Sequence, residues 1–266
     1  CEGRCNLTCA RALETAILQA GPENVAAFVA EPVVMAGAAV AVPPPGYFEE
    51  IRAICDRYDV LWIADEIITG FGRTGRYFAS EYWDAVPDMI CFGKAASSGY
   101  VPLGGVVFSD RIRQSFVDAG DSFAHVFTYV NNPVAMRVCA TVLDIIEEEK
   151  VIAHVAETGT YLAERAQLLN AHACVGDVRT KGLMMGIELV RDKETKAPFD
   201  PALGASARGA ALALERGLSI SGVAGVADWV RGDDLRFYPP LIITREQIDE
   251  AVAIIDAVLG ELDQLA

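Results

Sequence analysis

The sequence predicts an α/β protein, in which a domain with a mostly parallel sheet precedes a smaller α+β domain. Two observations lead to this prediction. In the first half, short apolar runs alternate with helical patterns at the spacing of βαβ units, which build parallel sheets. From Asn132 onward, long amphipathic helical patterns flank a strand–turn–strand pattern. We therefore expect two domains, covering residues 1–150 and 151–266.

The first half holds the elements of the predicted sheet. A helical pattern over 7–21 ends at Gly21-Pro22, two residues that interrupt helices. Residues 47–59 have helical periodicity with one apolar face. The β-rich apolar runs predict strands, and they cover residues 25–32, 60–68, 87–94 and 104–109.

The second half reads mainly as helices around a small sheet. Helical patterns cover 132–150, 152–171, 205–217 and 244–264, and strand patterns cover 174–190 (with a turn) and 233–244. Thr244 is predicted to cap the last helix, with Gln247 completing a capping box. His154 and His172 fall in helical patterns and are expected to be solvated.

The composition excludes several classes of partner. The 266 residues carry a formal net charge of −15, which disfavours nucleic acid because nucleic-acid binding requires clustered Lys and Arg. No apolar run is long enough for a membrane helix, so we expect no membrane partner, and the acidic composition favours a cytoplasmic protein. Cys1, Cys5 and Cys9 are spaced four residues apart, but no histidine or fourth cysteine lies near them. We therefore expect reduced thiols and no metal.

The segment from Gly70 to Gly75 matches the dinucleotide-binding pattern G-x-G-x-x-G after an apolar run. That mechanism requires a helix directly after the glycines, so that the helix N-terminus faces the pyrophosphate. The following residues are too few and too aromatic for such a helix before Pro87. A dinucleotide-dependent oxidoreductase therefore remains an alternative that the sequence disfavours.

Charged residues follow two neighbouring predicted strands. Asp65 and Glu66 end the strand pattern of 60–68, and Lys94 ends that of 87–94. Ligands in open α/β sheets bind at the carboxyl ends of strands. A lysine held there in apolar surroundings has a lowered pKa and can attack a carbonyl.

Several motifs in a fixed order resemble a known family. They are "GPENVAAFVAEPV", "DEIITGFGRTG", "PDMICFGKAASSGYVPLGG", "FTYVNNP" and "RFYPPLIITREQIDEA". Together they resemble the class III (ω-amino) branch of pyridoxal-phosphate-dependent aminotransferases, from about Leu13 to the C-terminus. The resemblance implies fold type I, with a partial large domain and a C-terminal small domain. It also implies a longer N-terminal region that carries the phosphate-binding loop.

The resemblance assigns roles to five residues of the large domain. Lys94 resembles the Schiff-base lysine, and Asp65 the acid that pairs with the pyridine nitrogen. Ile67 occupies the place of a β-branched residue that packs on the cofactor ring. Thr128 resembles a threonine that binds the cofactor phosphate of a neighbouring subunit, which implies a homodimer. Glu31 resembles a carboxylate near the pyridoxal hydroxyl.

The resemblance also implies the reaction and its partners. Arg236 resembles an arginine that binds a substrate carboxylate, and Arg231 is an alternative for that role. The expected activity transfers an amino group from an ω-amino acid or amine to pyruvate or another 2-oxo acid. A decarboxylase or aminomutase of the same fold remains an alternative. A catalytically impaired fragment that acts only as a folded or oligomeric module is a further one.

Overall fold

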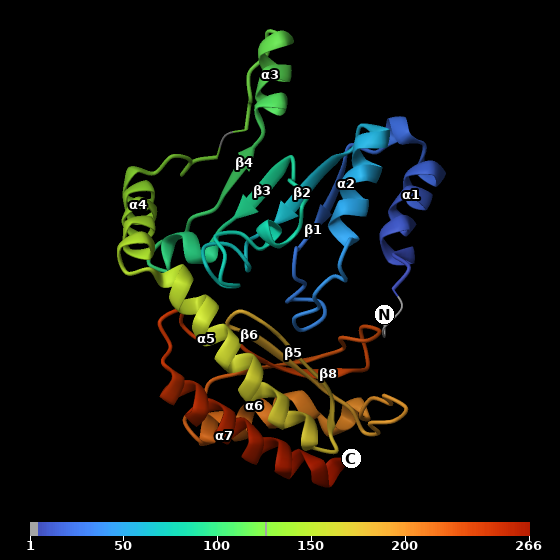
Figure 1. Cartoon of the computed structure of the whole chain (residues 1–266), viewed down its shortest axis with the longest axis vertical. Helices are drawn as coiled ribbons and strands as arrows, with labels where there is room; N and C mark the ends of the chain where they lie inside the picture. Colours follow the sequence, from blue (N-terminus) through green and yellow to red (C-terminus); the bar gives the residue numbers. More distant parts are fainter. Residues whose placement is uncertain (1–4, 126) are drawn as a thin grey trace. The chain divides into compact units, whose positions relative to one another are not determined.

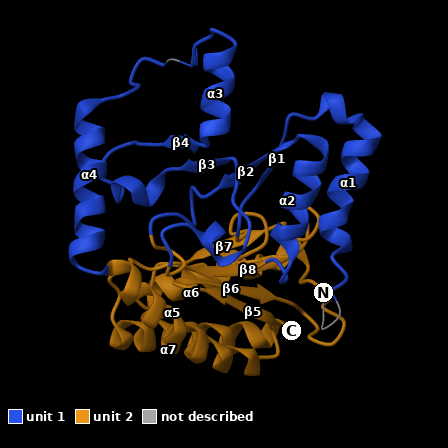
Figure 2. Ribbon diagram, turned by 45° about the horizontal axis from the view of Figure 1, so that its top comes forward, with its two compact units in different colours: residues 1–32, 43–71, 76–150 blue, residues 33–42, 72–75, 151–266 orange. Residues whose placement is uncertain are grey.

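A computed structural model describes residues 5–125 and 127–266 of the chain. The chain forms two compact units, drawn in blue and orange in Figure 2. Unit 1 comprises 1–32, 43–71 and 76–150, and unit 2 comprises 33–42, 72–75 and 151–266. Both units are therefore built from separate segments of the chain, and each is described by itself below.

Unit 1 contains a four-stranded sheet with the order β1-β2-β3-β4 (Figure 1). The strands are β1 (Ala27–Ala30), β2 (Leu61–Asp65), β3 (Met89–Phe92) and β4 (Gly105–Phe108). The first three run parallel, and β4 pairs antiparallel with β3. The prediction of a mostly parallel sheet is therefore confirmed.

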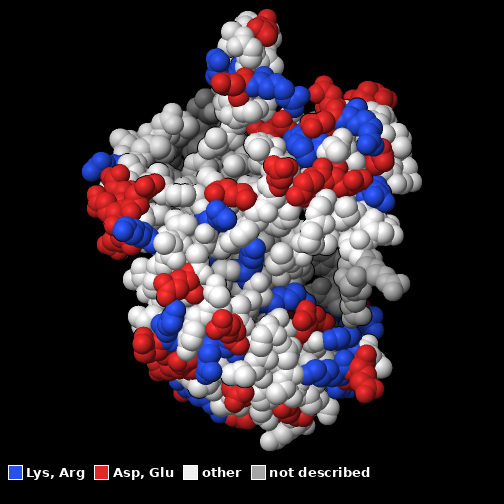
Figure 3. Space-filling view, in the orientation of Figure 1, with Lys and Arg blue, Asp and Glu red and all other residues white. Residues whose placement is uncertain are grey.

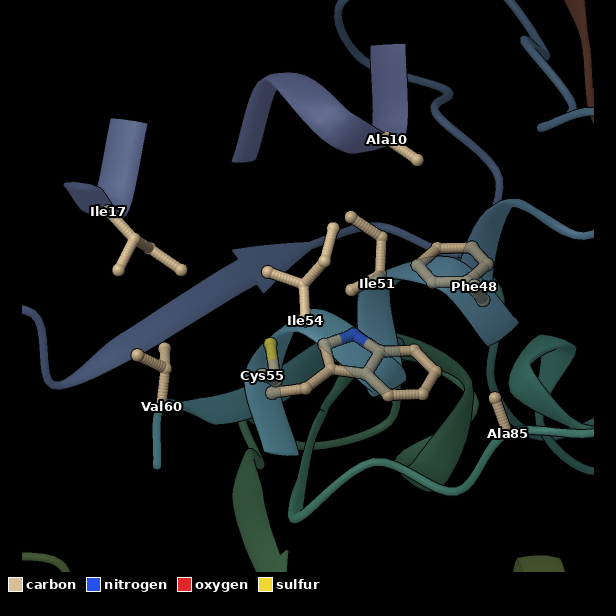
Figure 4. Packing of buried hydrophobic residues seen from close by; sticks show 9 residues of the cluster. Ala10, Ile17, Phe48, Ile51, Ile54, Cys55, Val60 and Ala85 are labelled. Carbon is tan, nitrogen blue, oxygen red and sulfur yellow. The ribbon is translucent and has the colours of Figure 1, made fainter. Parts of the chain in front are cut away.

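Two helices cover one face of this sheet and form its apolar core. α1 (Thr8–Ala20) packs against α2 (Tyr47–Tyr58), which lies on β2. Figure 4 shows Ile51 and Ile54 of α2 pointing toward the same apolar cluster as Ile17 of α1. Phe48 stacks on Trp62 with the ring centroids 4.9 Å apart. The apolar spacing in the α2 segment therefore predicts its buried face correctly.

The rest of unit 1 follows the sheet. It contains α3 (Asp110–Asp118), α4 (Pro133–Glu148) and the short 3₁₀ helices Pro22–Asn24, Ala79–Tyr82 and Lys94–Ser97. The Asn132 side chain caps α4 by accepting hydrogen bonds from the N–H groups of Val134 and Ala135. Glu147, Glu148 and Glu149 form an acidic group at the C-terminal end of α4 (Figure 3).

Unit 2 contains an antiparallel sheet with the order β5-β6-β8-β7. Its strands are β5 (Val175–Lys181), β6 (Met184–Leu189), β7 (Ser221–Ala224) and β8 (Asp233–Phe237). The helices are α5 (Val151–Ala166), α6 (Ala205–Glu215) and α7 (Arg245–Leu262), with 3₁₀ turns at Gln167–Ala171, Pro201–Leu203 and Asp263–Leu265. Thr244 and Gln247 form the predicted capping box of α7.

Two arginines hold the segment Val33–Val42 in unit 2. Arg179 donates hydrogen bonds to the carbonyl oxygens of Ala38 (3.2 Å) and Ala39 (3.1 Å), and Arg236 donates to that of Ala36 (2.9 Å). Ala39 and Val40 have positive φ angles of 40° and 64°, which are strained for non-glycine residues. Three charge-assisted bonds to nearby carbonyls help to maintain this conformation.

The expectation that His154 is solvated is wrong, because it is partly buried and its Nε2 lies 2.9 Å from the carbonyl oxygen of Ile243. The expectation for His172 is wrong as well. Its ring lies between two carboxylates, with Nδ1 2.8 Å from Asp263 and Nε2 3.0 Å from Asp256. His172 follows a 3₁₀ turn at the end of α5 and is not on a solvated helix face. Because the two carboxylates come from the C-terminal end of α7 and the turn after it, the sequence around His172 could not indicate them.

The cysteines of the described residues are free thiols. Cys1 lies outside the described residues, whereas Cys5 and Cys9 are free thiols. Among the helices of residues 5–125 and 127–266, none is long and apolar enough to cross a membrane.

Candidate functional site

Three of the predicted site residues follow the carboxyl ends of three adjacent parallel strands in unit 1. Glu31 follows β1, Asp65 ends β2, and Lys94 comes two residues after β3. The register pairs Ala30 with Ala64. Because adjacent parallel strands end at the same edge of a sheet, Glu31, Asp65 and Lys94 lie along one edge.

Asp65 presents a carboxylate that can accept a further partner. Its side chain is half-buried, and Oδ1 accepts the N–H of Ile67 at 3.1 Å. Within the described part of the chain, no cation lies within salt-bridge distance of it. Cys91 is opposite Asp65 in the β2–β3 pairing. Burial, with a smaller effect of the Asp65 charge, raises the pKa of the Cys91 thiol, which therefore stays protonated at neutral pH.

Ile67 lies beside the backbone that leads to Lys94. Its side chain is exposed, and its Cγ2 is 3.8 Å from the position that a Cβ atom on Gly93 would occupy. Since Gly93 has no side chain, the face of Ile67 stays open next to the lysine. An exposed β-branched side chain at this position offers a flat apolar surface to a planar ligand.

Lys94 has an unusual backbone conformation. It begins a 3₁₀ turn with a φ angle of 41°, in the left-handed region. Buried Ser97 anchors this turn by donating its hydroxyl proton to the carbonyl oxygen of Val101 (2.7 Å), and the carbonyl oxygen of Lys94 lies 3.4 Å from the same hydroxyl. The Lys94 side chain is exposed, and its ammonium contacts no carboxylate in the described residues. Strained backbone held by its surroundings is typical of functional positions.

Sequence reasoning missed the role of Glu66. Its side chain is fully buried and accepts hydrogen bonds from Thr69 Oγ1 (2.5 Å), Ala79 N (2.9 Å) and Ser80 N (2.7 Å). The alternation along β2 could have indicated this burial, because Glu66 shares its face of the strand with buried Trp62 and Ala64.

The predicted phosphate-binding threonine is exposed. Thr128 lies in the turn before α4, and no hydrogen bond joins it to Glu31, Asp65 or Lys94 in the described residues. The structure therefore brings four of the five large-domain residues to the sheet edge or to the segments that leave it, and Thr128 is not among them.

The two arginines of unit 2 differ strongly in availability. The Arg231 side chain is 61% exposed and pairs with Asp228 at 2.7 Å. The Arg236 side chain is only 7% exposed. It makes a bidentate ion pair with Asp234, with both N–O distances at 2.7 Å, and it also donates to Ala36.

The glycine motif forms a turn in a setting that does not suit a dinucleotide. Gly72 and Gly75 have φ angles of 104° and 85°, which glycine tolerates. The next helix in the chain is the single 3₁₀ turn Ala79–Tyr82. Arg73 donates to the carbonyl oxygens of Pro239 (2.5 Å) and Leu183 (3.3 Å), and burial lowers its pKa to about 10.

The sheet edge in unit 1 offers groups that suit the aldehyde and the ring of pyridoxal phosphate. Lys94 would supply an amine for the aldehyde, Asp65 a carboxylate for the ring nitrogen, and Ile67 an apolar surface for the ring. Neither Lys94 nor Asp65 forms an ion pair within the described residues. The residues present therefore fit this cofactor.

Comparison with known proteins identifies the class. The family model for class III aminotransferases matches residues 1–259, and the chain belongs to this family. Members of the family depend on pyridoxal phosphate. The chain is 43% identical over 247 residues to a putrescine–pyruvate aminotransferase of Pseudomonas aeruginosa, covering 92% of this chain and 52% of the relative. It is 41% identical over 249 residues to a diaminobutyrate–2-oxoglutarate transaminase of Halomonas elongata, with 92% and 52% covered.

Solved transaminase structures share the fold. A transaminase from the marine bacterium Virgibacillus superposes with a TM-score of 0.90 at 38% identity, covering 96% of this chain and 57% of that one. An amine transaminase from an uncultivated Pseudomonas species, in a form with pyridoxal phosphate bound, gives a TM-score of 0.86 at 37% identity, with 95% and 56% covered. The predicted fold type I architecture is thereby confirmed. The chain spans about half the length of the curated relatives it matches.

Proposed function

We propose that the protein is a pyridoxal-phosphate-dependent aminotransferase that transfers an amino group from an ω-amino acid or amine to pyruvate or another 2-oxo acid. The observation that carries this proposal is the placement of Lys94 and Asp65 on neighbouring strand ends, with Ile67 beside them. Among the relatives are enzymes named for putrescine, diaminobutyrate and γ-aminobutyrate, which supports terminal amines as the donor class.

The chemistry divides between the cofactor and the chain. When bound, pyridoxal phosphate supplies an electron-withdrawing ring that stabilises negative charge at the substrate carbon. Lys94 would hold the cofactor through Nζ, and the same amine would move a proton at the substrate carbon. Asp65 keeps a proton on the ring nitrogen through a charge-assisted hydrogen bond. Ile67 packs on the ring and fixes its plane.

Two further residues of unit 1 are proposed to take part. Glu31, next to Asp65 along the sheet edge, is proposed to lie near the pyridoxal hydroxyl. Thr128 is proposed to bind the cofactor phosphate of a second subunit in a homodimer. Its exposure supports this role, because its hydroxyl is accessible to a partner chain.

Arg231 and Arg236 are the proposed ligands of a substrate carboxylate. The exposed Arg231 has only the Asp228 pair to give up, and an exposed ion pair contributes about 1 kcal/mol or less. Arg236 would have to release the buried Asp234 first, which costs more. We therefore favour Arg231 for direct contact with the substrate carboxylate. Arg236 would bind that carboxylate only if its ion pair with Asp234 opened.

A half-reaction tests the proposed function. The chain, incubated with pyridoxal phosphate and then with putrescine or γ-aminobutyrate, should convert the cofactor to its amine form, which is measurable by absorbance and mass spectrometry. Lys94→Arg should abolish the conversion, whereas Lys150→Arg, a change in a lysine distant in sequence, should not. If the chain binds no cofactor and converts none, the alternative of a catalytically impaired module is favoured for these 266 residues.

A further inference from the structure

The side chain of Glu66 is a buried carboxylate that accepts three hydrogen bonds. Its carboxylate is fully buried, and all three of its side-chain partners are donors: one hydroxyl and two backbone N–H groups. No cation pairs with it in the described residues. Each donor satisfies part of the desolvated charge, so the carboxylate is fixed in position by the donors around it.

The backbone of Glu66 is fixed as well. Its N–H donates to the carbonyl oxygen of Cys91 at 2.9 Å, which extends the pairing of β2 with β3 past Asp65. Its carbonyl oxygen accepts the N–H of Gly70 at 2.8 Å. Glu66 therefore connects β3, the turn at Thr69 and Gly70, and the first residues of the 3₁₀ helix that begins at Ala79.

This network sets the direction of its two neighbours. Successive side chains of a strand point to opposite faces, so burying Glu66 on the face of Trp62 and Ala64 turns Asp65, the last residue of β2, to the other face. Ile67 begins the turn that follows. The N–H of Ile67 bonds the Asp65 carboxylate at 3.1 Å, which links the two residues. A movement of Glu66 would change the placement of both.

We propose that Glu66 is a positioning residue that aims Asp65 and Ile67 at the cofactor ring, a role that rests on the proposed function of this site. Glu66 itself does not touch the cofactor. Its three donors hold the strand end rigid, and the strand end orients the carboxylate that meets the ring nitrogen. Partners of this kind behind metal ligands change affinity by about 10–100-fold when mutated, and we expect an effect of that order for cofactor binding.

Two variants and one control test the proposal in the full chain. Glu66→Gln keeps the shape but replaces one acceptor oxygen with a donor NH₂ group, which cannot accept a hydrogen bond. Thr69→Val removes one of the three donors while leaving the carboxylate. Glu81→Gln is the matched control, because Glu81 also accepts a backbone N–H in this turn, that of Phe78 at 2.8 Å, but at an exposed site.

Amide hydrogen exchange of the cofactor-free chain is the first readout. The expected result is faster exchange at Ala79 and Ser80 in Glu66→Gln, together with faster exchange at Ile67, whose N–H is hydrogen-bonded to the Asp65 carboxylate and not to the Glu66 side chain. Thr69→Val should show a smaller change in the same direction, and Glu81→Gln should match the wild type. Unchanged exchange at Ile67 in Glu66→Gln overturns the proposal, whether or not the wild type binds cofactor.

Cofactor binding is the second readout. We expect the apparent Kd of pyridoxal phosphate to rise at least about 10-fold in Glu66→Gln, with a shift in the pH midpoint of the visible absorbance band. If Ala79 and Ser80 exchange faster but affinity and pH midpoint stay at wild-type values, Glu66 only stabilises the turn and the proposal is wrong. If the wild type itself binds no cofactor at Lys94, the proposed function fails, and the exchange at Ile67 still decides whether Glu66 positions its neighbours.

Discussion

The Cα atom of Thr74 lies 2.5 Å from the position that a Cβ atom on Gly182 would occupy. A Cβ on Gly159 would in turn lie 2.7 Å from the Cα atom of Gly182. The turn between β5 and β6 is therefore packed between α5 and the segment Gly72–Gly75, all within unit 2. The glycines at 159 and 182 are required for this close approach of three backbone segments.

Replacing Gly182 by alanine should destabilise unit 2. The new methyl group would overlap backbone atoms, which cannot rotate away, and φ at this position is 55°. Overpacking of this kind costs about 1–3 kcal/mol. The measurement is urea unfolding followed by circular dichroism. Gly204→Ala is the control, because Gly204 has a similar φ of 57° but no atom within 4 Å of the Cβ position. Equal losses in the two variants would show that the contact with Thr74 contributes nothing.

Removing the Arg236 guanidinium should destabilise the protein far more than removing that of Arg231. Arg236→Met leaves Asp234 buried without its partner, and breaking a buried pair costs about 3–5 kcal/mol. Arg231→Met breaks an exposed pair and should cost about 1 kcal/mol or less. Thermal unfolding of both variants checks the difference. Adding Asp234→Asn to Arg236→Met should recover part of the loss, and failure to recover would contradict a paired role for Arg236.

The contribution of His172 to stability should decrease as pH rises. Burial lowers the pKa of His172, but hydrogen bonds and charges of Asp263 and Asp256 outweigh it, so the net pKa is raised. The protonated ring is thus favoured in the folded state. Its stabilisation is complete below the unfolded pKa of about 6.5 and is lost as pH rises through the higher folded value. Wild type should therefore exceed His172→Gln in stability by more at pH 5.5 than at pH 9. A difference that grows with pH would contradict this account.

Cysteine reactivity should follow burial. Desolvation raises the pKa of Cys55 to about 11 and that of Cys174 above its usual range, whereas Cys9 is exposed. Since the thiolate is the reactive form, a thiol reagent at pH 8 should modify Cys9 rapidly and spare Cys55 and Cys174 until the chain unfolds. Mass mapping of the labelled cysteines with time gives the order. Early labelling of Cys55 would show that the α1–α2 core is open.

Periodicity predicted the larger elements of the fold. The helices α1, α2, α4, α6 and α7 and the strands β1 to β6 and β8 lie within the ranges expected from apolar spacing and from Gly and Pro positions, and α5 begins one residue before its expected range. Among the α-helices and strands of the described residues, α3 and β7 were not predicted. α3 has nine residues and β7 has four, and short segments give the weakest periodic signal.

The order of the motifs predicted the residues of the candidate site. The hydrogen bonds and ion pairs of the surrounding residues were not predicted. Asp65, Ile67 and Lys94 follow strands that the sequence indicates, so their common edge could be expected. The hydrogen bonds of Glu66 to Ala79 and Ser80, the ion pair of Arg236 and the carboxylates around His172 depend on side-chain geometry or on residues distant in sequence. Local patterns carry no information on such partners.

One measurement tests the central claim most directly. The 266-residue chain is mixed with pyridoxal phosphate, reduced with borohydride and digested, and the modified lysine is located by mass spectrometry, with Lys94→Ala as the control. The account predicts one adduct per chain on Lys94 and none in the control. Scattered labelling of surface lysines, equal in both proteins, would contradict the assignment of Lys94 as the residue that holds the cofactor.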